Sequence, residues 1–177
     1  MNPLSGFYFP LFSMALSQGN AITAQLAAKA MIKRKKGGRI INLLSIDAFR
    51  PSGVFVAYDA AKAGLWAVTK SLAKELAEHQ ILVNAVAPGA TITPERIAAM
   101  KEGSFVSSQV PADAVETRKK LEERMKSGGF AQMLAQMPLG RPGFPDEIAK
   151  AVLFFASDLG SYVSGVCLTV DGGQSLS

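Results

Sequence analysis

The stretch "RIINLLSIDAFRPSGVFVAYDAAKAGLWAVTKSLAKELAEHQILVNAVAP", residues 39–88, predicts a strand, a helix and a second strand. Short apolar runs at residues 39–45 and 81–88 form its two ends. Residues 57–79 between them predict an amphipathic helix, whose apolar face carries Leu65, Val68, Leu72 and Leu76. Apolar strands separated by amphipathic helices are typical of βαβ units, in which the strands run parallel.

The same alternation continues on both sides of this stretch. Residues 20–35 predict a helix with Asn20 as its cap and with Ile22, Leu26 and Ala30 on one face. Residues 144–157 predict another helix, with Pro145 at its start, and residues 165–173 a third buried strand. The expected fold class is therefore α/β, with a parallel sheet covered by helices on both faces.

Residues 94–137 interrupt this pattern with a polar and irregular insert. Thr93 and Pro94 suit the cap and first position of a following helix, and short helices are expected at 94–102, 111–126 and 130–136. A chain of 177 residues fits one domain with one core, so the insert is expected to belong to a single domain, 1–177.

Composition limits the class of protein. One cysteine, Cys167, forms no internal disulfide, so nothing indicates an oxidising compartment and we expect a cytoplasmic protein. The apolar residues 4–16 lack the basic start of an export signal and contain Gly6 and Pro10, which leaves such a signal as the weaker alternative. No stretch predicts a membrane span. The formal charge of +5 suits an anionic ligand.

Three side chains in the central stretch suggest acid–base chemistry. Tyr58 and Lys62 are four residues apart and share a helix face. An ammonium group beside a phenol favours the phenolate, which brings the pKa of the tyrosine toward neutral pH. Ser45 ends the preceding strand, at the edge of a parallel sheet where ligands bind. A tyrosine and a lysine at this spacing also occur on many solvated helices, so the pair alone decides nothing.

Five blocks in fixed order add to this reading. The blocks are "GGRIINLLS", "YDAAKAGL", "ILVNAVAPGATITP", "PLGRPGFPDEIAKAVLFFASD" and "YVSGVCLTVDGG". In these blocks the sequence resembles the short-chain dehydrogenase/reductase family over residues 17–177. The resemblance implies a Rossmann-like sheet of which about three strands are present. It also implies hydride transfer between NAD or NADP and a carbonyl–alcohol pair.

The resemblance assigns roles to individual residues. It implies Ser45, Tyr58 and Lys62 as catalytic residues, with Ser45 on the substrate oxygen and Tyr58 as proton donor or acceptor. Lys62 would also bind the nicotinamide ribose. The implied cofactor-binding residues are Tyr58, Lys62, Pro88, Gly89, Thr91 and Thr93. No metal site is implied. The insert at 94–137 matches the substrate lid of the family, and a partly apolar substrate is expected from Phe105, Val106, Phe130, Met133 and Met137.

Two departures from the family pattern qualify these roles. The sequence has no Gly-rich turn for the cofactor pyrophosphate, so we expect an N-terminally truncated fold with weak NAD(P) binding. Because the segment that distinguishes NAD from NADP is also absent, the choice between them stays open. Leu16 aligns where the family carries an active-site asparagine, unless Asn20 or Asn2 substitutes for it.

Two other functions compete with the enzyme. A catalytically inactive remnant would act as a dimerisation or partner-binding module through residues 20–35 and 58–78. The small side chains there suit close helix packing, and the resemblance implies a homo-oligomer. The basic run "KRKKGGR" at 33–39 would suit nucleic acid, but a solvated helix end is the more common reading, and no nucleic-acid partner is expected.

Overall fold

The computed structural model describes residues 9–51, 55–94, 98, 119, 123, 125–135 and 137–176. These residues form two compact units. The sheet unit comprises Met1–Pro88 and Ile148–Val170, and the loop unit comprises Gly89–Glu147 and Asp171–Ser177. Each unit is described by itself below.

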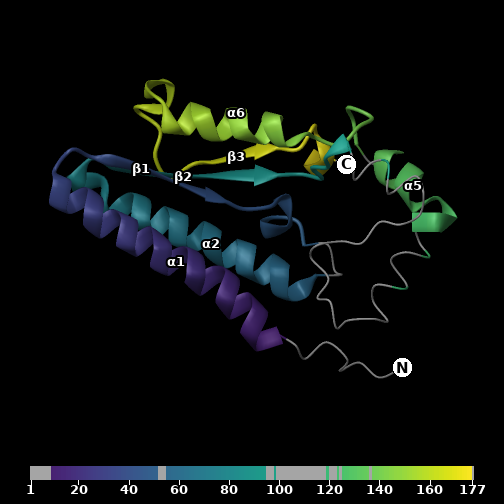
Figure 1. Ribbon diagram of the computed structural model, residues 1–177, viewed down its shortest axis with the longest axis horizontal. Helices are drawn as coiled ribbons and strands as arrows, with labels where there is room; N and C mark the ends of the chain where they lie inside the picture. The colour runs from purple at the N-terminus through teal and green to yellow at the C-terminus, as the bar shows by residue number, and fades with distance from the viewer. Residues whose placement is uncertain are drawn as a thin grey trace. The chain divides into compact units, whose positions relative to one another are not determined.

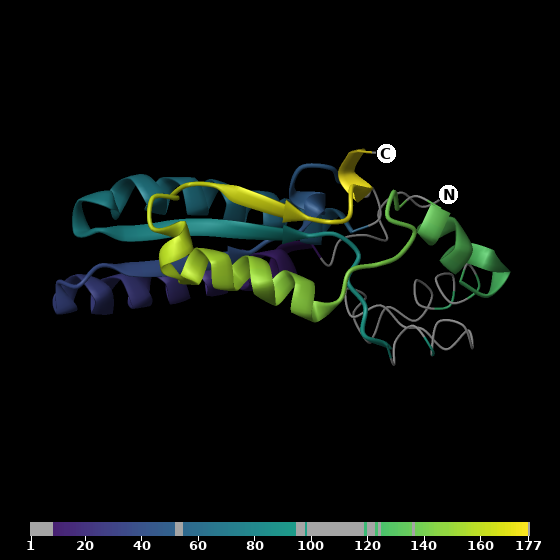
Figure 2. The same ribbon diagram turned by 90° about the horizontal axis from the view of Figure 1, so that it is seen from above.

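A parallel sheet of three strands organises the sheet unit. The strands are β1 (Gly38–Leu43), β2 (Ile81–Pro88) and β3 (Cys167–Val170), in the order β1-β2-β3. Gly38 pairs with Ile81 at one end of the first ladder and Leu43 with Val86 at the other. β2 and β3 run side by side, as Figure 2 shows. The prediction of a Rossmann-like parallel sheet is confirmed for these strands.

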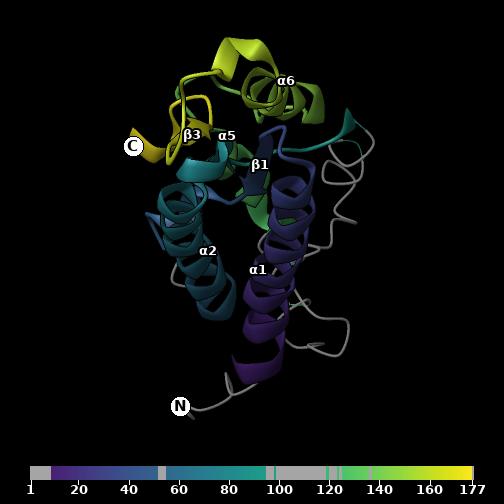
Figure 3. The ribbon, with the colours of Figure 1, turned by 90° about the vertical axis from the view of Figure 1, so that its left-hand side faces the viewer.

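Helices cover both faces of this sheet (Figure 1). The long helices α1 (Phe9–Arg34) and α2 (Val56–Glu75) lie side by side on one face, as Figure 3 shows. α6 (Pro145–Ala156) packs on the other face through Ile148, Ala151 and Phe155. The short helices η1 (Ile46–Ala48), η2 (Ala77–His79) and η4 (Asp158–Gly160) connect these elements.

The loop unit has little regular structure among the described residues. It contains the π-helical turn η3 (Met125–Gly129), the helix α5 (Phe130–Ala135) and the 3-10 turn η5 (Gln174–Leu176). α5 matches the short helix predicted at 130–136. The helices predicted at 94–102 and 111–126 lie mostly outside the described residues, as do Phe105 and Val106. Met137 is buried, with 4% of its surface exposed.

The face of α1 that packs on the sheet is formed by small residues. The residues of α1 that face the sheet are Ala24 and Ala28, which pack with Ile40 of β1. Ile22 and Leu26, predicted to share a face with Ala30, are 56% and 61% exposed. Small alanines let the helix axis approach the sheet closely, whereas the larger side chains are turned away from it. Asn20 is also not a cap, because α1 begins eleven residues earlier, at Phe9.

The third strand differs from its prediction too. β3 was expected to be buried, but Leu168 is 38% exposed and Cys167 is half-buried. A strand at the edge of a sheet has a neighbour on one side only, and this explains the exposure. Asn84 of β2, 2% exposed, fixes the segment before β3 by donating to the carbonyl of Val163 at 2.6 Å and accepting from the Val166 amide at 3.1 Å.

Candidate active site

The candidate site begins where two strands end. Ser45 follows β1, and Pro88 ends β2 at the same edge of the sheet, because Leu43 pairs with Val86 and the Leu44 amide donates to the Val86 carbonyl at 2.7 Å. The carboxyl ends of parallel strands are the usual ligand edge of such a sheet. The structure therefore places Ser45 where the sequence predicted it.

Ser45 is buried and held in a fixed position. It is 8% exposed and caps η1 from an extended backbone conformation. Its Oγ accepts the amide of Asp47 at 3.2 Å and donates to Asp47 Oδ2 at 3.0 Å. A short polar side chain at the first position of a helical turn commonly accepts a backbone amide in this way. Both hydrogen bonds go to the same residue, which the sequence analysis did not single out.

Tyr58 and Lys62 lie together on α2, as their spacing predicted. The Lys62 Nζ is 5.5 Å from the centroid of the Tyr58 ring. The same Nζ donates to the carbonyl of Leu43 at 2.7 Å, at the end of β1. Burial lowers the pKa of Lys62 from its usual value. Lys62 therefore connects the tyrosine to the strand end from which Ser45 follows.

The position of α2 is fixed by a buried polar contact. Asn42 of β1 donates through Nδ2 to Thr69 Oγ1 at 2.9 Å, and Thr69 Oγ1 donates to the Leu65 carbonyl at 2.8 Å. Thr69 is fully buried and Asn42 is 8% exposed. α2 also packs against η1, the turn that Ser45 caps. A satisfied buried hydrogen bond of this kind specifies one arrangement of helix and strand, so the three candidate side chains are held by the core.

Asp47 is a polar residue of this region that sequence reasoning missed. Burial raises the pKa of its carboxyl, the hydrogen bond from Ser45 lowers it, and the charge of Asp59 raises it, with a net raised value. The signal that would have found it is the Ser-x-Asp pattern directly after a strand, where a serine cap and an acid two residues later face the same turn.

Of the other predicted cofactor residues, Pro88 ends β2, and Gly89, Thr91 and Thr93 follow it in the loop unit. A Cβ on Gly89 would be 2.6 Å from the Asp171 Cβ and 2.7 Å from Gln174 Oε1, so only glycine fits there. Gln174 Oε1 accepts the Ala90 amide at 2.8 Å. Thr91 Oγ1 donates to the Gly89 carbonyl at 3.1 Å, and Thr91 bridges to Gly143. Thr93 is half-buried in the same segment.

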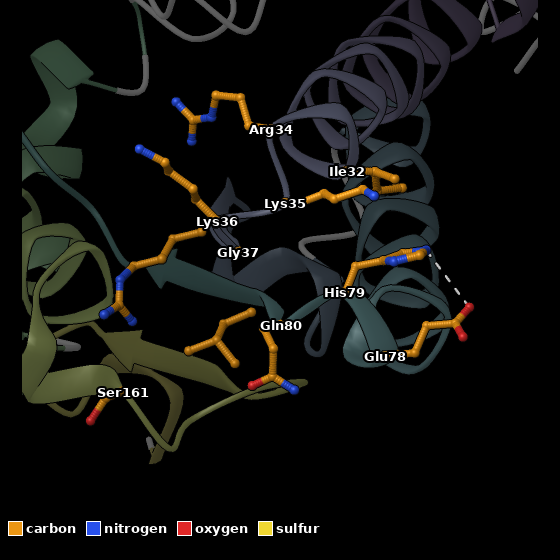
Figure 4. Close-up of a pocket in the computed structure, with 12 residues that line it drawn as sticks. Ile32, Arg34, Lys35, Lys36, Gly37, Glu78, His79, Gln80 and Ser161 are labelled. Carbon is orange, nitrogen blue, oxygen red and sulfur yellow. Dashed lines mark ion pairs between the residues drawn. The ribbon is translucent and has the colours of Figure 1, made fainter.

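A hollow of the sheet unit lies elsewhere, at the opposite edge of the sheet (Figure 4). It measures about 820 Å³ and opens where β1 and β2 begin. Its lining includes Arg34, Lys35, Lys36 and Arg39, with the pair of Glu78 and His79 at 3.7 Å on one side. No candidate catalytic residue lines it. The candidate site is therefore defined by the strand ends and by side-chain geometry, and this hollow is not part of it.

Two features are absent from the residues that the structure describes. None of their helices is long and apolar enough to cross a membrane. No group of three or more metal-ligating side chains occurs among them. Burial raises the pKa of Cys167 to about 11, so its thiol is protonated at neutral pH.

Comparison with known proteins agrees with the geometry. The short chain dehydrogenase family matches residues 16–102, and the family described as enoyl-(acyl carrier protein) reductase matches residues 108–175. A 3-oxoacyl-[acyl-carrier-protein] reductase of Aquifex aeolicus is 39% identical over 156 residues, which are 88% of this chain and 52% of the relative. A 3alpha-hydroxysteroid dehydrogenase of Mediterraneibacter gnavus is 40% identical over 151 residues, 84% of this chain and 49% of the relative.

A solved structure extends the likeness to three dimensions. The crystal structure of an acetoin dehydrogenase from Salmonella typhimurium is 38% identical, with a TM-score of 0.69 over 93% of this chain and 54% of that one. The chain thus spans about half the length of the relatives it matches. With its parallel sheet, its ordered sequence blocks and these matches, the chain belongs to the short-chain dehydrogenase/reductase family.

Proposed function

We propose that the chain carries the acid–base centre of an NAD(P)-dependent oxidoreductase, with Ser45, Tyr58 and Lys62 as catalytic residues. The observation that supports this most is the position of Lys62, whose half-buried ammonium lies 5.5 Å from the Tyr58 ring and donates to the end of β1. A lysine on a solvated helix face would have no reason to give up water for a backbone carbonyl.

Tyr58, Lys62 and Ser45 have different roles in the proposed proton transfer. Tyr58 gives a proton to the substrate oxygen during carbonyl reduction and takes it back during alcohol oxidation. The Lys62 ammonium stabilises the phenolate that remains, because an opposite charge nearby favours the charged form. Ser45 contacts the substrate oxygen from the strand end, where burial keeps its hydroxyl away from bulk water.

The cofactor would contribute the hydride. Lys62 suits the nicotinamide ribose, since its ammonium has three protons to donate and one of them is used on Leu43. Pro88, Gly89, Thr91 and Thr93 would line the nicotinamide, and the close packing around Gly89 gives that segment a fixed backbone. The described residues offer no Gly-rich turn for a pyrophosphate. They therefore fit the nicotinamide half of NAD or NADP.

The substrate class follows from what the relatives share. Their names include a 3-oxoacyl reductase, a hydroxysteroid dehydrogenase and an acetoin dehydrogenase. These substrates differ in size and polarity, but each has a ketone or a secondary alcohol. We propose a ketone–secondary alcohol pair as the substrate of this chain, with a partly apolar body.

Replacing Tyr58 tests the proposed chemistry. Tyr58→Phe keeps the ring and removes the proton donor, so we expect reduction of any accepted ketone by NADH or NADPH to fall by about 10²–10⁴-fold. Tyr162→Phe is the matched control, since Tyr162 is fully exposed and should leave turnover unchanged. Circular dichroism checks that both variants fold. A Tyr58→Phe variant that retained most of its turnover would exclude Tyr58 as the acid.

A second function, self-association, is favoured by the outer face of α1. Ile22 and Leu26 expose more than half of their surface there, and a Cβ on Gly64 of α2 would meet open space. Exposed apolar side chains on one helix, beside a helix that carries a small residue, suit close packing of a second copy of the chain. We expect a dimer by sedimentation velocity at micromolar concentration and a monomer for the Ile22→Lys, Leu26→Lys variant. Leu159→Lys, at another exposed site, is the control; a monomeric parent chain would contradict the proposal.

A further inference from the structure

The two hydrogen bonds between Ser45 and Asp47 limit what Ser45 offers a ligand. A serine hydroxyl has one proton to donate and two lone pairs with which to accept. In the structure the proton points to Asp47 Oδ2 at 3.0 Å, and one lone pair accepts the Asp47 amide at 3.2 Å. One lone pair is left. Such a group can accept a hydrogen bond from an alcohol, but it has nothing to donate to a ketone oxygen.

We propose that Asp47 is a positioning residue whose carboxylate holds the Ser45 proton, so that the site favours an alcohol ligand until Asp47 is protonated. A protonated Asp47 can instead donate its own O–H to Ser45 Oγ. The serine proton is then released and can turn toward a ketone oxygen. One proton on Asp47 thus converts Ser45 from an acceptor into a donor, with no other change in the site.

The surroundings of Asp47 move this exchange to a higher pH than an ordinary aspartate would give. Burial is the main reason why the pKa of Asp47 is raised; the Ser45 hydrogen bond opposes it, and the charge of Asp59 adds to it. α2 packs on η1, the turn that contains Asp47, and its titratable residues nearby are Tyr58, Asp59 and Lys62. The Lys62 ammonium donates to the Leu43 carbonyl. β2 also packs on the turn and has no titratable side chain, while Arg50 follows in the same turn.

The effect on ligand preference rests on the proposed function, but the hydrogen bond between Ser45 and Asp47 can be measured without enzyme turnover. Carboxyl ¹³C NMR of the whole chain gives the pKa of Asp47. The hydrogen bond from Ser45 favours the carboxylate, so Ser45→Ala should raise this pKa further, while Ser45→Thr, which keeps the hydroxyl, should leave it near the parent value. Asp171, which follows β3 and whose pKa is lowered by its own hydrogen bonds, is the control and should keep its pKa in all three proteins.

A measurement on the unaltered chain tests the proposal even if a Ser45 variant fails to fold. A deuterium isotope effect on the Asp47 carboxyl carbon reports an O–H donor directly, and we expect one above the Asp47 pKa. The proposal would be overturned if Ser45→Ala left the Asp47 pKa unchanged, or if the Asp47 carboxyl carbon showed no isotope effect.

The consequence for the reaction is a pH profile. Above the Asp47 pKa, a ketone must compete with the Asp47 carboxylate for the Ser45 proton. Because a hydrogen bond to a charged group is strong, the KM for a ketone should rise about tenfold as pH rises through the Asp47 pKa. Asp47→Asn should flatten this profile, because its amide accepts or donates regardless of pH. A flat parent profile would contradict the proposal. An inactive parent with the Asp47–Ser45 coupling intact would instead contradict the proposed function and leave the positioning role standing.

Discussion

The two edges of the sheet have opposite characters. At the carboxyl edge, Ser45 is buried and Lys62 is partly desolvated, and each is tied to a neighbouring group. At the amino edge, a cluster of long basic side chains surrounds an open hollow of about 820 Å³. The edge with this hollow is not the edge with the candidate chemistry.

The direction of the helices explains this difference. α1 and α2 both end at the amino edge, with Lys33 and Arg34 in the last turn of α1 and Lys74 in the last turn of α2. Basic residues are favourable there because the last carbonyls of a helix carry partial negative charge. The basic run at 33–39 therefore has a structural reason that requires no anionic ligand. At the carboxyl edge, no such requirement explains why Lys62 gives up water.

The largest effect that distinguishes the two edges of the sheet is expected in a cofactor titration. We expect NADPH to bind the 177-residue chain at millimolar concentration or weaker, because each missing hydrogen bond to a phosphate is worth about 1.5–3 kcal/mol and about 1.4 kcal/mol is tenfold in affinity. Nicotinamide fluorescence measures it. Lys62→Met should abolish the residual binding, and Lys36→Met at the amino edge should preserve it.

The result would be informative in either direction. Saturation at low micromolar NADPH would show that a Gly-rich turn is dispensable for this chain. Loss of binding in Lys36→Met, with Lys62→Met unaffected, would reverse the assignment of the two edges.

A smaller effect is expected from the segment that follows β2. Gly89→Ala would force a Cβ to within 2.6 Å of the Asp171 Cβ, and overpacking of this kind costs about 1–3 kcal/mol. Gly143→Ala is the control, since its Cβ would meet its nearest atom at an ordinary 3.6 Å. Urea unfolding compares the two. Equal midpoints would mean that the loop around Gly89 is more open than the structure shows.

The smallest effect concerns pH and Asp171, which follows β3. Burial alone would raise the pKa of Asp171, but hydrogen bonds from Ser175 and Gly173 outweigh it and the pKa is lowered. A carboxyl with a lowered folded-state pKa stabilises the fold above its unfolded pKa, and this contribution is lost as pH falls through the folded value. Asp171→Asn should therefore lower the free energy of unfolding at neutral pH. The difference in this free energy between the variant and the parent should become smaller in acid.

Thermal melts at a series of pH values measure this difference. Asp146→Asn is a control in the first turn of α6, at an exposed position. A difference between Asp171→Asn and the parent that grows as pH falls would contradict the sign of the linkage.

Local patterns in the sequence predicted much of the fold and part of the site. The apolar runs at 39–45 and 81–88 became β1 and β2, and the spacing of Tyr58 and Lys62 placed them on one face of α2. Both results depend on the period of a strand or helix, which a few neighbouring residues fix. The alternation of apolar strands with amphipathic helices predicted the parallel arrangement of the sheet.

Contacts between distant segments could not be predicted in the same way. The periodicity of α1 showed an apolar face at Ile22 and Leu26, but the sheet selected the alanine face, because close approach of helix and sheet depends on side-chain size on both. The partial exposure of β3 follows from its place at the sheet edge. Likewise, the sequence by itself determined that Ser45 ends a strand, whereas only the tertiary structure showed that burial and a turn direct its proton to Asp47. Burial and hydrogen-bond direction depend on every segment packed around a group, and no local pattern contains that information.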